Sequence, residues 1–96
     1  MEIKEIIRTL SDFMDMNRDR YEIIRIGVFG SAIRGSMNEQ SDIDVVVKLD
    51  KQDLFNIIGI KQDLEEQFSK PVDVISYREK MNQFLKKRID KEAVYV

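Results

Sequence analysis

The sequence contains no cysteine and no histidine, and it has only one proline among its 96 residues. Without cysteine, the chain can form neither a disulfide framework nor a thiolate zinc site. Without histidine, it lacks the commonest general base and the commonest ligand of transition metals. Any chemistry must therefore use carboxylates, hydroxyls, lysine and arginine, and the metal ions left open to it are hard cations that bind oxygen.

An excess of charge of one sign is also missing, because 16 Lys and Arg residues stand against 18 Asp and Glu residues, a net charge of −2. A mixed, slightly acidic surface does not attract a phosphate backbone over long range, which argues against a nucleic-acid partner. No apolar run is long enough to span a bilayer, and the N-terminus lacks the apolar core of a signal peptide. We expect a cytoplasmic protein without membrane contact, formed by one domain over residues 1–96.

The spacing of apolar residues predicts an α/β (α+β) fold, in which helices flank a small sheet of three to four strands. The helix between the second and third strands is long enough for a crossover connection. We expect the Phe and Met residues at helical spacing to lie in the core, together with a stripe of Leu54, Ile57, Ile58, Leu64 and Phe68. The expected elements are a helix over 2–16, a polar break over 17–21, a strand over 23–29, a short helix over 32–34, a loop over 35–41, a strand over 42–49, a helix over 51–68, a strand over 72–75, a helix over 78–89 and an edge strand over 93–96.

Two aspartates, Asp42 and Asp44, open the otherwise apolar second strand. Their spacing of two residues points both carboxylates to the same face of the strand. Two carboxylates on one face repel each other unless a cation lies between them, and a hard cation such as Mg²⁺ or Mn²⁺ suits oxygen ligands. The alternative is a strand end that meets solvent, with both side chains hydrated.

Two further features surround this pair in the sequence. Gly30 and Ser31 leave the first strand, and glycine lets the backbone approach an anion while serine offers a hydroxyl. Such a pair is also an ordinary turn. Asp73 stands between two valines in the third strand, where an outward-facing edge position is the alternative. If that strand lies beside the second, three carboxylates can hold two metal ions, the arrangement for in-line nucleotidyl displacement.

The combination of Gly30-Ser31-Ala32-Ile33-Arg34-Gly35, Ser41-Asp42-Ile43-Asp44 and Val72-Asp73-Val74 resembles the DNA polymerase β-like nucleotidyltransferase superfamily. Within it, the chain is similar to the minimal nucleotidyltransferase (MNT) group of prokaryotes. The resemblance covers almost the whole chain, including the ending Glu92-Ala93-Val94-Tyr95.

The resemblance implies a polymerase β-like fold with a small mixed sheet, and a Mg²⁺-dependent transfer of a nucleotide, AMP from ATP, to a hydroxyl. Gly30 and Ser31 would contact the triphosphate, Asp42 and Asp44 would ligate Mg²⁺, and Asp73 would complete a second metal site and assist deprotonation of the acceptor. Arg34 would reach a phosphate, or it would brace the loop against Asp42 or Glu39. The basic cluster of Lys86, Lys87 and Arg88, with Lys91, is interpreted as a solvated helix face, and a binding patch is the alternative.

The chain has no room for the extra helical domain of larger superfamily members, so we expect an active cleft that is open on one side. In the MNT group the partner is often a HEPN-type toxin, whose tyrosine accepts AMP, and the MNT member acts as antitoxin. Two alternatives remain at this point: an antitoxin that neutralises its partner by binding alone, and a transferase for small molecules of the aminoglycoside kind, with a homodimer completing the site.

Overall fold

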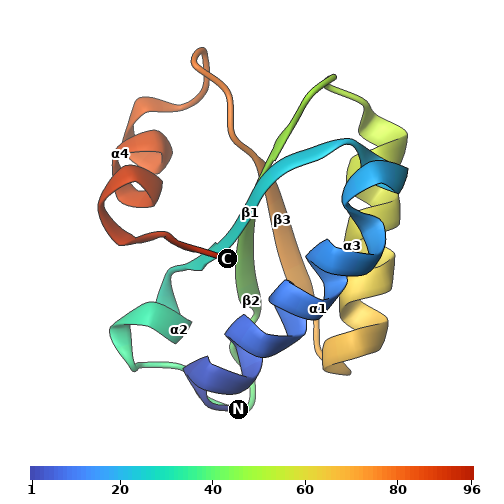
Figure 1. Cartoon of the computed structure of the whole chain (residues 1–96). Helices are drawn as coiled ribbons and strands as arrows, with labels where there is room; N and C mark the ends of the chain where they lie inside the picture. Colours follow the sequence, from blue (N-terminus) through green and yellow to red (C-terminus); the bar gives the residue numbers. More distant parts are fainter.

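Strands and helices alternate along the chain in the computed structural model, which describes all of residues 1–96. Figure 1 shows α1 and α3 side by side on one face of the sheet and α4 on the other. The elements are α1 (Ile3–Tyr21), β1 (Ile23–Phe29), α2 (Ser31–Arg34), β2 (Ile43–Leu49), α3 (Leu54–Phe68), β3 (Val72–Ser76), α4 (Gln83–Glu92) and β4 (Val94–Tyr95).

The four strands form one mixed sheet in the order β3-β2-β1-β4. β1 is antiparallel to both β2 and β4, whereas β2 and β3 are parallel and are joined by α3. The predicted crossover and the predicted edge strand are therefore confirmed. No helix in the structure is long and apolar enough to cross a membrane.

The two faces of the sheet bury very different amounts of apolar side chain. On the α1 and α3 face, 16 buried residues form one cluster, which includes Ile43, Val45 and Val47 of β2. On the other face, only Phe29, Val46 and Ile89 are buried together. The alternation of side chains along β2 therefore sends every second residue to a thinly covered face, where α4 packs on only part of the sheet.

The first helix is longer than predicted, because the expected polar break at 17–21 is helical. That segment has no glycine or proline, so nothing in its backbone prevents the helix from continuing. Tyr21 is buried at the end of it and stacks on Phe13, with ring centroids 6.2 Å apart. The helix ends instead at Glu22, whose left-handed φ of 56° forms the C-cap.

The last helix begins at Gln83 instead of residue 78, because the Asn82 side chain caps it by accepting a hydrogen bond from the Leu85 N–H at 3.1 Å. The α3 helix likewise begins after residue 51, since Asp53 caps it by accepting from Phe55 N–H.

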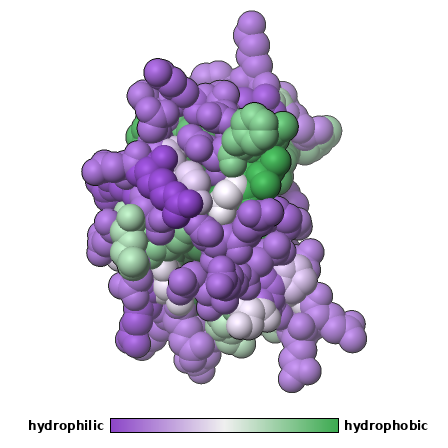
Figure 2. Space-filling model, turned by 90° about the vertical axis from the view of Figure 1, so that its right-hand side faces the viewer, coloured by the Kyte–Doolittle hydropathy of each residue, from purple (hydrophilic) through white to green (hydrophobic).

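The prediction that the Phe and Met residues and the α3 stripe are core is wrong in part. Helical periodicity indicates which side chains share a face of the helix, but not whether another element covers that face. Ile60, Leu64 and Phe68 are buried, and the large apolar side chains left exposed in the helices include Met16, Leu54, Phe55, Ile58 and Phe84. Figure 2 shows a mostly hydrophilic surface over α1 and α3, with apolar side chains gathered near its upper edge, the end at which α3 begins.

Candidate nucleotidyl-transfer site

The candidate site lies at one end of the sheet, where β1 ends and where β2 and β3 begin. The strand register places Phe29 opposite Asp44 and places Asp44 opposite Asp73. Because Ile43 and Val45 face the α1 and α3 core, Asp44 faces the thinly covered side, and the parallel register carries Asp73 to the same side. The hypothesis that the Asp73 strand lies beside the Asp44 strand is thus confirmed.

The turn after β1 lies directly against Asp44. Gly30 has a φ of +76°, which favours glycine, and a Cβ placed on it would lie only 2.2 Å from Oδ2 of Asp44. A side chain at this position would therefore collide with the carboxylate. Ser31 follows as the first residue of α2 and is half-buried. Gly30, Asp44 and Asp73 therefore lie together at this end of the sheet, and Ser31 follows directly on Gly30.

The electrostatics of the site centre on Asp44. Burial raises the pKa of the Asp44 carboxyl, and the nearby negative charges of Asp73 and Asp42 raise it further, while Arg88 and Arg34 lower it. The net effect is a raised pKa, which means that the surroundings of Asp44 disfavour its ionised form. A cation bound beside Asp44 would relieve both the burial cost and the repulsion.

The aspartates do not form a complete metal-binding site by themselves, since no group of three acidic side chains in the chain is placed to hold a metal ion. Asp42 and Asp73 are exposed, and only Asp44 is partly buried. This arrangement fits Mg²⁺ better than a cation that needs a complete protein shell, because Mg²⁺ keeps several waters and is usually bound by one or two carboxylates together with substrate phosphates.

Arg34 makes an ion pair, but with a residue that the sequence analysis did not consider. Its Nη1 lies 3.1 Å from Oε1 and 3.2 Å from Oε2 of Glu92, so the predicted brace against Asp42 or Glu39 is wrong. Glu92 stands at the end of α4 and also accepts a hydrogen bond from the Gly30 N–H at 3.1 Å. Burial acts to raise the Glu92 pKa, but the hydrogen bonds from Arg34 and Gly30 outweigh it and lower the pKa.

The basic residues of α4 are also more than a solvated face. Lys86 pairs with Glu79 at 3.0 Å, and the Arg88 guanidinium lies 5.9 Å from the centroid of the Phe29 ring, at the end of β1. The only signal in the sequence for this C-terminal contribution was the family-like ending from Glu92 onward. Gly30 and Glu92 are 62 positions apart in the sequence, so the local spacing of apolar residues does not predict their contact.

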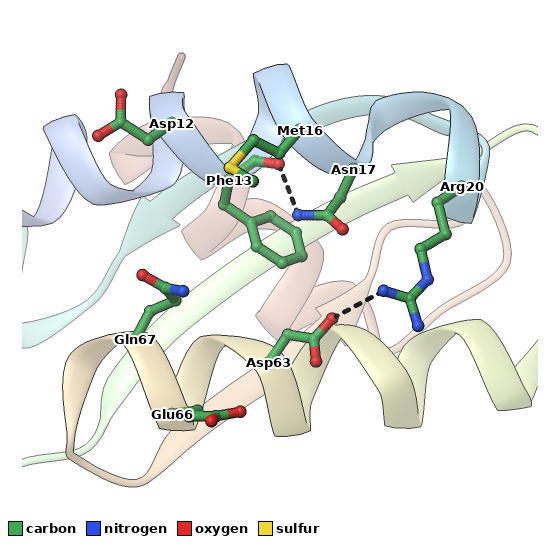
Figure 3. A pocket seen from close by; sticks show the side chains of 8 residues that line it. All are labelled: Asp12, Phe13, Met16, Asn17, Arg20, Asp63, Glu66 and Gln67. Atoms are coloured by element: carbon green, nitrogen blue, oxygen red, sulfur yellow. Dashed lines mark hydrogen bonds and ion pairs between the residues drawn. The ribbon is translucent and has the colours of Figure 1, made fainter.

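The three aspartates line none of the cavities of the molecule, so the site is an open surface rather than a closed pocket. A shallow hollow of about 240 Å³ does exist elsewhere, between α1 and α3 on the opposite face of the sheet. Figure 3 shows its polar lining, in which Arg20 pairs with Asp63 and Asn17 donates to the Phe13 carbonyl. None of its lining residues belongs to the candidate site.

Asp44 and Asp73 thus lie side by side on adjacent strands, next to the Gly30-Ser31 turn and on an open face of the sheet. The family model described as "Polymerase beta, Nucleotidyltransferase" matches residues 4–96, and the chain belongs to this family. It is therefore an enzyme of the nucleotidyltransferase class, with the polymerase β-like fold.

The chain is similar in sequence to proteins that are named for one kind of nucleotidyl transfer. A Methanocaldococcus jannaschii protein named "putative protein adenylyltransferase" is 33% identical over 98 residues, covering 99% of this chain and 95% of that protein. The protein adenylyltransferase MntA of Thermococcus cleftensis is 30% identical over 95 residues, covering 98% of this chain and 95% of MntA. The chain is thus similar along its whole length to protein adenylyltransferases.

Solved structures agree on the fold. One described as a "putative minimal nucleotidyltransferase" is 27% identical, with a TM-score of 0.79 over 98% of this chain and 95% of that one. Another, of a tri-AMPylated Shewanella oneidensis HEPN toxin in complex with an MNT antitoxin, is 19% identical, with a TM-score of 0.65 over 91% of this chain and 67% of that one. The second likeness is one of fold.

Proposed function

We propose that this chain transfers AMP from ATP to a tyrosine hydroxyl of a HEPN-type protein and thereby acts as its antitoxin. The observation that carries the proposal is the direct pairing of Asp44 with Asp73 on the open face of the sheet, against the Gly30 turn. The names of similar proteins support adenylyl transfer, and the complex of similar fold supports the kind of partner.

The roles of the residues follow from their places. The Gly30 turn brings backbone close to the carboxylates, and Ser31 and Arg34 stand beside it to hold phosphate oxygens. Asp73 is exposed and accepts the proton of the incoming hydroxyl on a carboxylate oxygen. The hydroxyl oxygen then forms a bond to the α-phosphorus, the bond from that phosphorus to pyrophosphate breaks, and pyrophosphate leaves.

The donor set fits Mg²⁺, because it consists of carboxylate oxygens whose mutual repulsion a divalent cation relieves. We propose two ions, one held by Asp42 and Asp44 and a second completed by Asp73. When bound, Mg²⁺ neutralises charge on the triphosphate and makes the acceptor hydroxyl more acidic. Asp44, which is nearest the Gly30 backbone, orients the nucleotide side of the site.

An open site needs something to exclude water and to present the acceptor, and a folded partner protein can do both. The exposed positions of Asp42 and Asp73 leave room for a large acceptor at the sheet end. A small-molecule transferase would need an acceptor pocket, and no cavity of the chain is lined by these residues. Transfer to a protein is therefore the better match.

The first test is calorimetric titration of ATP, with and without Mg²⁺, into the wild type and into the double variant Asp42→Asn/Asp44→Asn. We expect Mg²⁺-dependent binding that the variant loses. The matched control is Asp12→Asn/Asp15→Asn, which makes the same change of net charge at exposed positions of α1. Equal binding by the wild type and the site variant would contradict the proposed site.

The second test is incubation with labelled ATP and a HEPN-type protein, followed by mass spectrometry of the tyrosines of that protein. We expect one or more AMP additions with the wild type and none with the site variant. If the site variant, still folded, protects cells from the toxin as well as the wild type does, neutralisation is by binding and the catalytic role is wrong.

A further inference from the structure

The end of α4 takes part in the candidate site through Glu92. Its carboxylate lies between the Gly30 N–H and the Arg34 guanidinium, at 3.1 Å from each. The Glu92 side chain is only 19% exposed, whereas that of Arg34 is 47% exposed. A surface glutamate that forms an incidental ion pair would be far more exposed than this, so the arrangement is built into the fold.

Glu92 and α2 together determine the orientation of the Gly30 peptide groups. On one side, the Gly30 N–H donates to Glu92. On the other, the Gly30 carbonyl accepts from the N–H groups of Ile33 and Arg34, at 3.0 and 3.1 Å. The turn that lies against Asp44 is thus held at both its ends, and Glu92 is the only side chain that does so.

The surrounding packing explains why Glu92 reaches this point. Ile89, one turn earlier in α4, is fully buried against Phe29 and Val46. Directly after Glu92, β4 pairs with Gly27 and Val28 of β1. The approach is so close that a Cβ on Gly27 would lie 2.7 Å from the Val94 carbonyl oxygen. The segment around Glu92 is therefore anchored before and after it, and the carboxylate has little freedom to move.

The pairing leaves most of the guanidinium available. Both contacts to Glu92 use Nη1 of Arg34, so the donors on Nη2 and Nε remain for a further anion. Glu92 therefore occupies one nitrogen of the guanidinium, while nearly half of the arginine side chain stays exposed.

We propose that Glu92 is a positioning residue: it holds Arg34 and the Gly30 turn in the arrangement that receives the triphosphate, and it acts through them without touching the nucleotide. This inference rests on the proposed function and deepens it, because it assigns the C-terminal end of the domain to nucleotide binding. Partners that orient a ligand-binding group typically change affinity by roughly 10-fold to 100-fold when they are removed.

The test is calorimetric titration of Mg²⁺ and ATP into the full chain and its variants. We expect Glu92→Ala to weaken binding by roughly 10-fold to 100-fold. Glu92→Gln should fall between Ala and the wild type, because its amide oxygen still accepts from Gly30. The stability control is Asp53→Ala, which removes the N-cap of α3 at the far end of β2. It should lower the melting temperature without changing nucleotide affinity.

A double-mutant cycle with Arg34→Ala tests whether Glu92 acts through Arg34. Once Arg34 is absent, Glu92→Ala should have a clearly smaller effect than in the wild type. Unchanged or tighter binding by Glu92→Ala, or effects that simply add, would overturn the positioning role. If the wild type itself binds no nucleotide, the proposed function fails and the Glu92 role fails with it. If the wild type binds and only the Glu92 expectation is missed, the proposed function stands.

Discussion

The two faces of the sheet differ in what they bury and in what they leave exposed. The α1 and α3 face carries a continuous cluster of 16 buried residues, in which Ile6, Leu10, Ile60 and Leu64 are completely buried. The α4 face buries three residues and ends in Asp44 and Asp73. One face therefore supplies most of the hydrophobic free energy of folding, and the other carries the charges of the candidate site.

This division explains how so small a domain tolerates like charges side by side. Repulsion among Asp42, Asp44 and Asp73 works against folding, and nothing in the chain neutralises it completely. The core on the other face compensates for this cost, so the site can stay open and ready for a cation. Substitutions in the core on the α1 and α3 face should accordingly lower stability. Substitutions of the carboxylates on the other face should lower activity without lowering stability.

The largest effect is expected at Asp44. Replacing Asp44 with Asn should lower the rate of AMP transfer by about 1000-fold or more, because a metal contact is worth several kcal/mol of transition-state stabilisation. The melting temperature should not fall, since the substitution removes a repelled carboxylate. Rates with labelled ATP and a thermal melt of the same sample check both parts. A large fall in melting temperature would mean that Asp44 is a structural residue.

The next effect is a difference in stability between two Leu→Ala variants. Leu64→Ala in the large cluster should reduce the free energy of unfolding by about 3 kcal/mol, since it leaves a cavity among fully buried neighbours. Leu85→Ala on α4, where the side chain is only half-buried, should cost about 1 kcal/mol. Urea denaturation of both variants measures the gap. Equal losses would show that the two faces contribute alike.

A smaller effect concerns pH. The folded-state pKa of Asp44 is raised above its ordinary value of 3.8. The ionised carboxylate therefore destabilises the fold above the raised pKa, and this cost disappears as the pH falls through it. Asp44→Asn should be more stable than the wild type near neutral pH, by less than about 1 kcal/mol given solvent screening. The difference in stability between the variant and the wild type should vanish toward pH 4. Thermal melts of both proteins across pH 4–8 measure it. A difference that stays constant over this range would contradict the prediction.

The smallest effect is expected for the exposed phenylalanines. Phe55 and Phe84 are each 84% exposed, so replacing either with Ser should change the free energy of unfolding by no more than about 0.5 kcal/mol. Urea denaturation is again the measurement. A loss comparable to that of Leu64→Ala would show that these rings are packed in solution and that the helical pattern predicted the core correctly there.

Several parts of the structure could be predicted because they depend on local pattern. The alternation along β2 gave the face to which Asp44 points, and the length of the segment before β3 indicated a crossover. The extent of α1 could not be predicted from polarity, since the stretch 17–21 is polar yet helical and is held by the stacking of Tyr21 on Phe13. The ends of α3 and α4 depended on the capping side chains Asp53 and Asn82.

By itself, the sequence determined the chemistry of this protein, because a chain without cysteine and histidine leaves carboxylates and hydroxyls as its reactive groups. It also determined the strand pattern that presents those carboxylates. Only the tertiary structure decided that Glu92 contacts Gly30 and Arg34, and that Phe84 is left exposed. The physical reason is that periodicity describes which way a side chain points along its own element. What covers that side chain, or pairs with it, depends on elements some 60 residues away, whose placement the packing of the whole sheet decides.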